Sequence, residues 1–290
     1  GVRAAMIALL GITSVTAFRF ICFGDLLPLA YYAKAGSIGF GLRYGIEALI
    51  LSTSLVGMGL VILGARHGRN GDRVLAAALV AHLCAVVLAG GDWMPGYRLI
   101  VPVLPVYAAL AGIGVVRVFR RRRWLGLVML MLAGSVPALD LATRIPDLRA
   151  AGRSRDSLRE FVGWLHENAR VVALVDVGYI GFSSRVEVVD LAGLTDARIA
   201  RMPGGHLSKR ISVDYLKERS PDVIVLHSVA PPDVAADGRL RAFDGFAVEH
   251  HVAKMPFVRA GFRVERVISY TPNYHYIVLR RVESRQITPR

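Results

Sequence analysis

Residues 74–116 read "VLAAALVAHLCAVVLAGGDWMPGYRLIVPVLPVYAALAGIGVV", and this stretch decides the fold. Two apolar runs, 74–90 and 99–116, flank the polar segment "GGDWMPGYR" at 90–98. Each run approaches the roughly 20 apolar residues that a membrane-spanning helix needs. Pro102 and Pro105 are tolerated there because neighbouring groups can satisfy the freed backbone. The stretch therefore predicts two spanning helices joined by a tight loop.

Three further apolar stretches extend this pattern, at residues 2–17, 46–64 and 124–141. The sequence thus predicts a multi-spanning α-helical membrane domain over residues 1–142, with about five helices. The chain begins with Gly and shows no signal peptide. We therefore expect it to be the C-terminal part of a longer polypeptide.

The charge balance is strongly basic, with a net charge of +14 and a hydrophobic content of 54%. This combination is typical of a bacterial membrane protein with basic cytoplasmic loops. A nucleic-acid binder is the rival interpretation. However, the charge is spread along the chain, and its dense run, Arg120 to Arg123, lies between apolar segments. We therefore expect the lipid bilayer as a partner and no nucleic acid.

The short loops predict the orientation. "ARHGRNGDR" at 65–73 holds three arginines and "RVFRRRR" at 117–123 holds five, so both are expected in the cytoplasm. Alternation then puts residues 18–45, the 90–98 loop and everything after about residue 142 on the outer side. The expected location is the bacterial inner (plasma) membrane, with several passes and an extracytoplasmic C-terminal domain.

Residues 143–290 alternate polar segments with short apolar runs, and this pattern predicts a small extracytoplasmic α/β domain with a mixed sheet. Residues 142–157 are polar and are expected to link the two domains. Helical patterns are followed or preceded by short apolar runs typical of strands. The expected helices are 154–169 and 211–220, and the expected strands are 171–176, 186–191, 221–228, 262–270 and 274–282, the last two paired.

Two predicted outer loops carry unusual polar content. Lysine and arginine can bind a phosphate, and a carboxylate can take a proton from an acceptor hydroxyl. Together on one membrane face, such residues favour a functional cleft. The candidates are Asp25, Tyr31, Tyr32 and Lys34 in the first loop, and Asp92, Trp93, Tyr97 and Arg98 in the second.

Each candidate also has a structural alternative. Trp93 and Tyr97 fit an aromatic belt at the membrane interface. The basic side chains can anchor helix ends or meet anionic head groups. Asp25 and Asp92 each adjoin a glycine and can shape a turn. The sequence leaves these alternatives open.

Few other residues suggest chemistry. His82 lies within an apolar helix, where it can serve function or bond a neighbouring helix. His250 and His251 are adjacent, so in an extended strand they would point to opposite faces, and no metal pair is expected. Cys22 and Cys84 fit neither a zinc site nor a redox motif. Serine hydrolase and zinc-protease signatures are absent from the sequence.

Three segments carry a family resemblance. "FGDLLPLAYYAKAG" at 23–36 resembles the Y-G-D-x-x-P-x-x-Y-Y-A-K segment of bacterial GT-C type membrane glycosyltransferases. "GGDWMPGYRLIVPVLP" at 90–105 is similar to their G-G-D-[FWY]-M-x-x-x-R-x-x-x-P segment. "DVGYIGFSS" and "VVDLAGLTDARIAR", within 176–201, resemble their outer domain. Mycobacterial terminal arabinofuranosyltransferases are similar in this way.

The resemblance implies an enzyme that moves a sugar from a polyprenyl-phosphate donor to an extracytoplasmic glycan, lipid or protein acceptor of the cell envelope. The family's usual base is an acid in an outer loop upstream of this chain, so the fragment alone is expected to be inactive. No nucleotide or nicotinamide is expected. The resemblance leaves room for a divalent metal, although no metal-binding cluster in this sequence demands one.

The resemblance also suggests residue roles. Asp25 and Asp92 would orient hydroxyls or assist the base, and Lys34 and Arg98 would pair with the carrier phosphate. Trp93 and Tyr97 would stack on the sugar ring or the polyprenyl chain. Tyr31 and Tyr32 belong to the same expected substrate-binding surface.

Two rival functions remain. A transporter or flippase of lipid-linked sugars would need polar residues deep in several helices, whereas these helices are nearly free of charge apart from His82. A non-catalytic, membrane-anchored glycan-binding protein would not need two acidic outer loops.

Overall fold

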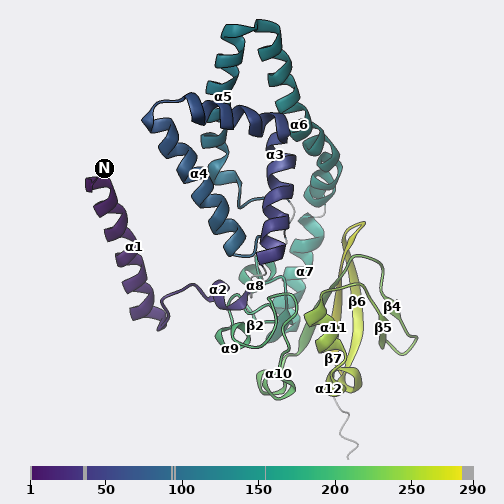
Figure 1. Ribbon diagram of the computed structural model, residues 1–290. Coiled ribbons are helices and arrows are strands. Elements are labelled where there is room, and N and C mark those ends of the chain that lie inside the picture. The colour runs from purple at the N-terminus through teal and green to yellow at the C-terminus, as the bar shows by residue number, and fades with distance from the viewer. Residues whose placement is uncertain (1, 35–37, 93, 95, 154, 283–290) are drawn as a thin grey trace, which may run out of the picture. The chain divides into compact units, whose positions relative to one another are not determined.

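The structure is a computed structural model that describes residues 2–34, 38–92, 94, 96–153 and 155–282 (Figure 1). The chain divides into two compact units. The helical unit comprises residues 36–149, and the α/β unit comprises residues 1–35 and 150–290.

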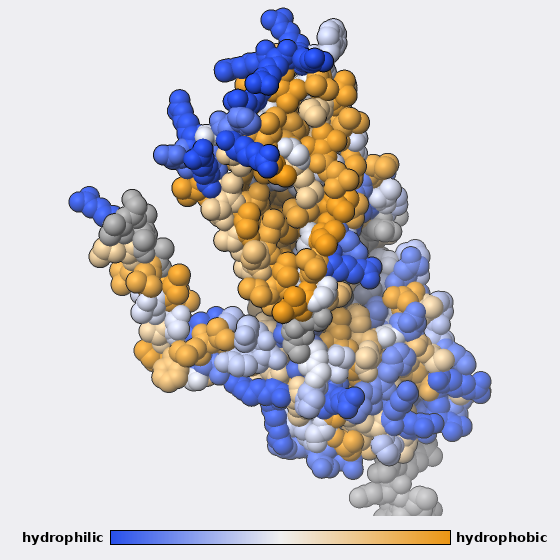
Figure 2. Space-filling model, viewed as in Figure 1, coloured by the Kyte–Doolittle hydropathy of each residue, from blue (hydrophilic) through white to orange (hydrophobic). Residues whose placement is uncertain are grey.

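The helical unit contains several long apolar helices. They are α3 (Ile38–His67), α4 (Asn70–Leu88), α5 (Leu104–Arg121), which follows the 3-10 turn η1 (Val101–Val103), and α6 (Arg123–Arg153). Among the described residues, four segments are long and apolar enough to cross a membrane: Ile38–His67, Asn70–Leu88, Val101–Arg121 and Arg123–Ala150. Apolar side chains cover these helices, whereas charged ones gather at the α3–α4 and α5–α6 turns (Figure 2).

Two helices extend further than their apolar runs predict. The α3 helix begins at Ile38 instead of residue 46, and α6 continues to Arg153 through much of the expected linker. Ion pairs one helical turn apart stabilise these polar ends. They join Arg43 to Glu47 at 2.7 Å and Arg144 to Asp140 at 2.8 Å. Hydropathy therefore marked the apolar part of each helix and missed its polar end.

Glycines set the close packing of α3 against its neighbours. A Cβ atom on Gly64 would collide with the Leu110 carbonyl of α5, and one on Gly114 would collide with Leu60 of α3. A Cβ atom on Gly41 would likewise collide with the Val87 carbonyl of α4. Small residues that let helix backbones approach are typical of packing between membrane helices.

The α3 helix is kinked at Ser54, where φ is 59° and ψ is 161°. Such a kink frees backbone groups, and other groups must then satisfy them. The Tyr107 hydroxyl of α5 donates a hydrogen bond of 2.9 Å to the Thr53 carbonyl. The Ser54 hydroxyl accepts one of 3.1 Å from the Gly57 N–H. The kink is therefore held both from within α3 and from α5.

The α/β unit begins with α1 (Val2–Phe23) and the short α2 (Leu29–Ala33). Within α1, Leu9–Phe23 forms a shorter apolar helix. The α2 helix packs against α9 (Ala197–Ala200), and Ala33 is fully buried there. The 24–34 segment therefore belongs to the α/β unit.

The sheet of this unit has five strands in the order β2-β1-β3-β7-β6. The edge strand β2 (Glu187–Asp190) and the neighbouring strands β1 (Val171–Leu174) and β3 (Val223–Ser228) are parallel. β7 (Tyr274–Arg281) runs antiparallel to both β3 and β6 (Phe262–Thr271). The predicted mixed sheet and the pairing of its last two strands are confirmed.

Helices cover both faces of the sheet, because the strand residues are apolar on both sides. On one face, α7 (Arg155–Asn168) packs through Phe161, Val162 and Leu165, beside α8 (Tyr179–Ser184). On the other face, α10 (Val213–Arg219) packs through Leu216. On the same face lie α9, through Ile199, and α11 (Ala247–Ala253) and α12 (Pro256–Gly261).

The segment between β3 and β6 was not anticipated. It forms a small hairpin of β4 (Asp233–Val234) and β5 (Leu240–Ala242), followed by α11 and α12. His250 and His251 do not lie in an extended strand, because both belong to α11. The Glu249 carboxylate accepts a 2.8 Å hydrogen bond from the Phe246 N–H and so satisfies one free donor where this helix begins.

Candidate functional site

The helical unit contains a polar pocket of about 330 Å³. The first turns of α3 contribute Arg43, Tyr44 and Glu47 to its wall. The loop between α4 and η1 contributes Asp92, Met94, Gly96 and Tyr97, and α6 contributes Arg144. Carboxylates and guanidinium groups from α3, α6 and the loop after α4 therefore share one cavity.

Positive backbone angles shape the loop that carries Asp92. Gly90, Gly91 and Gly96 have φ values of 80°, 68° and 99°, and Tyr97 has a φ of 51°. Glycine adopts such angles without steric cost, whereas a tyrosine there is unusual. A Cβ atom on Gly91 would also collide with the Tyr44 ring. The glycines in "GGDWMPGYR" thus provide the turn and allow the loop to lie against α3.

Asp92 forms an ion pair with Arg98 inside this loop. The Asp92 side chain is fully buried, whereas the Arg98 side chain is 54% exposed. The predicted phosphate partner Arg98 is therefore held by the predicted acid. This pair gives Asp92 a structural role in the loop, whatever else it does.

Tyr97 lies between two side chains that sequence reasoning did not single out. Its ring centroid is 5.6 Å from that of Tyr44, and the Arg144 guanidinium carbon is 5.5 Å from the Tyr97 centroid. Tyr44 in turn accepts a hydrogen bond of 3.3 Å from the Leu99 N–H. Aromatic rings and a guanidinium group therefore form one side of the pocket.

Arg43, Tyr44, Glu47 and Arg144 were all missed as candidates. The missed signal was the i, i+4 spacing of opposite charges at the edge of an apolar run: Arg43 with Glu47, and Asp140 with Arg144. Charged residues are costly in a membrane helix and are often functional there. Such pairs can therefore be read from sequence as polar helix ends.

His82 of α4 has a structural partner. Its Nε2 atom lies 2.7 Å from the Leu99 carbonyl. The histidine therefore joins α4 to the segment that precedes η1, which corresponds to the packing role considered for it.

Asp25 is held by an arginine of the α/β unit. Arg201 Nη2 lies 2.8 and 2.6 Å from the two Asp25 carboxylate oxygens. The Arg201 guanidinium carbon also lies 5.0 Å from the Tyr32 ring centroid. Tyr31 contacts Tyr32 edge-on at 5.8 Å, and Lys34 directly follows α2. The first predicted loop is thus tied to residue 201, which the sequence did not mark.

The predicted site residues therefore form two groups. Asp92, Tyr97 and Arg98 share the loop of the helical unit. Asp25, Tyr31, Tyr32 and Lys34 lie together around α2 in the α/β unit. Trp93 lies outside the described residues.

A separate polar cluster lies at the carboxyl ends of β1 and β3 in the α/β unit. The Tyr276 hydroxyl donates a 2.7 Å hydrogen bond to Asp176. The buried His227 ring stacks on Phe246 at 4.6 Å and contacts Tyr274 at 4.3 Å. Burial lowers the pKa of His227 and raises the pKa of both tyrosines. The His227 ring of this cluster is therefore in contact with the rings of Phe246 and Tyr274.

Within the described residues, no group of three His, Cys, Asp or Glu side chains could hold a metal ion.

Comparisons with known proteins give one match. A family model described as "Domain of unknown function (DUF8728)" matches residues 147–282, the segment from late α6 through β7. No curated protein and no solved structure matches the chain. The α/β unit is thus similar to a family whose description assigns no function.

Proposed function

We propose that this chain is part of an integral membrane glycosyltransferase of the GT-C type. The enzyme takes a sugar from a polyprenyl-phosphate donor and transfers it to an acceptor of the bacterial cell envelope. It lies in the inner membrane, and its α/β domain is extracytoplasmic. The residue resemblance at 23–36 and 90–105 motivates this class.

One observation carries the proposal: carboxylates and guanidinium groups line the same pocket of the helical unit. Sugar transfer from a phosphate carrier breaks a C–O bond and leaves a phosphate anion, and the acceptor hydroxyl loses a proton. Guanidinium groups stabilise the phosphate charge, and carboxylates orient or deprotonate hydroxyls. Arg43 and Arg144 serve the first task, while Asp92 and Glu47 serve the second.

The pocket also has a suitable wall for a sugar ring. Tyr44 and Tyr97 offer aromatic surface beside the charged groups. Ligand sites of this kind combine an apolar or aromatic lining with a few placed polar groups. Few charges lie within the spanning segments, which favours transfer at one face over transport through the helices.

The test uses the full-length protein with its upstream region, reconstituted in proteoliposomes with labelled short-chain polyprenyl-phosphate sugars. Asp92→Asn should reduce sugar transfer at least about 100-fold, because the carboxylate can no longer orient or deprotonate a hydroxyl. The side chain keeps its shape, so the amount of folded protein should stay unchanged. Product is measured by release of polyprenyl phosphate.

Asp156→Asn is the matched control, because Asp156 is an exposed aspartate of α7 outside the pocket. It should retain full transfer. Full transfer by the Asp92→Asn protein would overturn the site assignment. Glycan binding without turnover in the unmodified protein would instead favour a membrane-anchored binding protein.

A further inference from the structure

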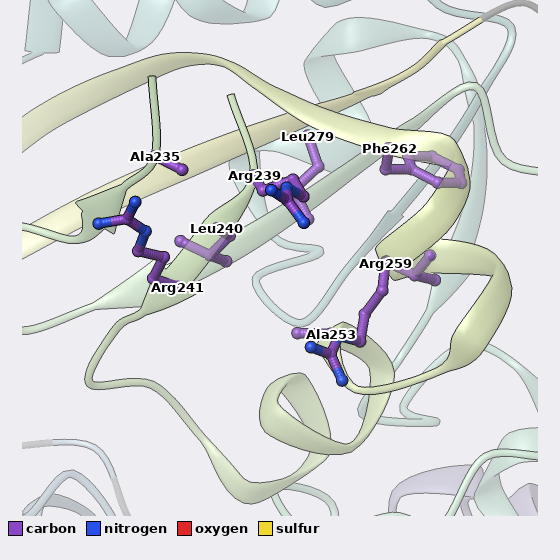
Figure 3. Close-up of a pocket in the computed structure, with 9 residues that line it drawn as sticks. Ala235, Arg239, Leu240, Arg241, Ala253, Arg259, Phe262 and Leu279 are labelled. Atoms are coloured by element: carbon purple, nitrogen blue, oxygen red, sulfur yellow. The ribbon is translucent and has the colours of Figure 1, made fainter. Parts of the chain in front are cut away.

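The α/β unit has a second pocket, of about 340 Å³, which the proposed function does not use. It lies among the β4–β5 hairpin, α12 and the start of β6 (Figure 3). Three arginines line it: Arg239 and Arg241 come from the hairpin, and Arg259 comes from α12. Leu240, Phe262 and Leu279 supply apolar surface.

The charge of this pocket is of one sign. Among the described residues that line it there is no carboxylate. In the part of the chain that the structure describes, the side chains of Arg241 and Arg259 have no ion-pair or hydrogen-bond partner. Arg239 is paired outside the lining, where its Nε donates to Asp237 at 2.5 Å. Two guanidinium groups therefore remain available toward one cavity.

The wall that carries two of these arginines is held in place by backbone hydrogen bonds. The Ala235 N–H donates to the Arg239 carbonyl at 2.8 Å and closes the hairpin. The Val264 N–H donates to the Gly238 carbonyl at 2.8 Å and ties the turn to β6. Gly238 has a φ of 78°, which the turn requires. The pocket is thus formed before any ligand binds.

We infer that this pocket binds a small phosphate ester. Guanidinium groups are planar forks that match phosphate oxygens, and like charges around one cavity are relieved by an anion. The volume lies in the lower range of small-molecule sites. The apolar floor suits the carbon part of an ester. This inference does not depend on the transfer reaction, because all lining residues belong to the α/β unit.

In the first experiment, the full chain in neutral detergent is titrated with glycerol 1-phosphate, and binding is measured by isothermal titration calorimetry. Saturable binding is expected, and the double variant R241Q/R259Q should weaken it at least about tenfold, because two charge-assisted contacts are lost. R241K should fall between the two, since an ammonium group keeps the charge but lacks the fork.

Arg210→Gln is the matched control, because it removes one charge from an exposed arginine outside this pocket. It should bind like the unmodified protein. An equal loss in this control would show unspecific charge attraction and overturn the inference. Thermal unfolding of each variant verifies that the fold is unchanged.

A second experiment distinguishes two possible natural ligands, a phospholipid headgroup and a soluble phosphate ester. The titration is repeated in nanodiscs of phosphatidylcholine, with and without phosphatidylglycerol. A weaker apparent affinity in the discs that contain phosphatidylglycerol identifies a lipid headgroup as the natural occupant, whereas an unchanged affinity identifies a soluble ester. Absence of saturable binding up to about 10 mM in detergent and in both discs overturns the site.

Discussion

Two buried carboxyl groups, one in each unit, are stabilised in different ways. Asp92 in the helical unit is 5% exposed and is paired with the Arg98 guanidinium. Glu249 in the α/β unit is 1% exposed and accepts hydrogen bonds of 2.8 Å from the backbone N–H groups of His227 and Phe246. The comparison shows that an arginine neutralises one carboxylate, whereas burial favours the protonated form of the other.

The largest expected effect concerns the pH dependence of stability at Glu249. Burial raises the pKa of Glu249 from 4.5 to about 8. Between these pH values the folded state holds a proton that the unfolded state has released. Stability contributed by this group is therefore full below pH 4.5 and falls as the pH rises to about 8, by up to about 4 kcal/mol.

His227 gives stability the opposite dependence on pH. Burial lowers its pKa below 6.5, so below that pH the unfolded state takes up a proton more readily and the fold loses stability. The window from pH 6.5 to about 8 therefore isolates Glu249. Thermal unfolding across this window should show a falling melting temperature as the pH rises.

Glu249→Gln should flatten this pH dependence and lower stability at acidic pH, because the amide nitrogen cannot accept a hydrogen bond, and the difference from the unmodified protein should shrink as the pH rises. Glu218→Gln is the matched control, since Glu218 is an exposed glutamate of α10. It should leave the slope intact. A Glu249→Gln protein that kept the slope would show that burial does not control this carboxyl group.

A smaller effect on stability is expected from breaking the Asp92–Arg98 ion pair of the helical unit. Arg98→Ala should destabilise the helical unit by about 3 kcal/mol, because it leaves the buried Asp92 carboxylate without its ion-pair partner. Asp92→Ala should lose only about 1 kcal/mol, because the half-exposed Arg98 can turn to water. Thermal unfolding in detergent measures both. Equal losses of stability in the two variants would mean that disruption of the loop, and not the unpaired buried charge, causes the destabilisation.

The smallest effect is expected at Asp25, whose ion pair with Arg201 is partly exposed. Such surface pairs contribute little to stability. Asp25→Ala should leave the melting temperature nearly unchanged but accelerate hydrogen exchange in residues 24–34, because α2 loses a tether to α9. Unchanged exchange there would show that burial of Ala33 alone holds the segment.

The sequence predicted those parts of the fold that have strong periodicity. Apolar runs located α4 and α5, and the apolar stripe of Phe161, Val162 and Leu165 located α7. Runs of β-branched residues located the five strands of the sheet. These signals are local, and tertiary contacts reinforce them.

Elements that depend on single contacts were missed. The α11 helix is short and starts at a hydrogen bond from Phe246 to Glu249, and the β4–β5 hairpin depends on bonds to β6. For the site, the sequence located the loop around Asp92 but not Arg144, which comes 52 positions later in the chain, nor Arg201, which lies 176 positions after Asp25. Spacing in sequence carries no information about such distant partners.

The kink of α3 has a mechanical consequence. The kink at Ser54 divides α3 into two helical segments. The Tyr107 hydroxyl of α5 donates a hydrogen bond to the Thr53 carbonyl, directly beside this kink. The position of α5 therefore helps to set the direction of the first segment of α3. That segment carries Arg43, Tyr44 and Glu47, so the kink and its hydrogen bond help to determine where these pocket residues lie.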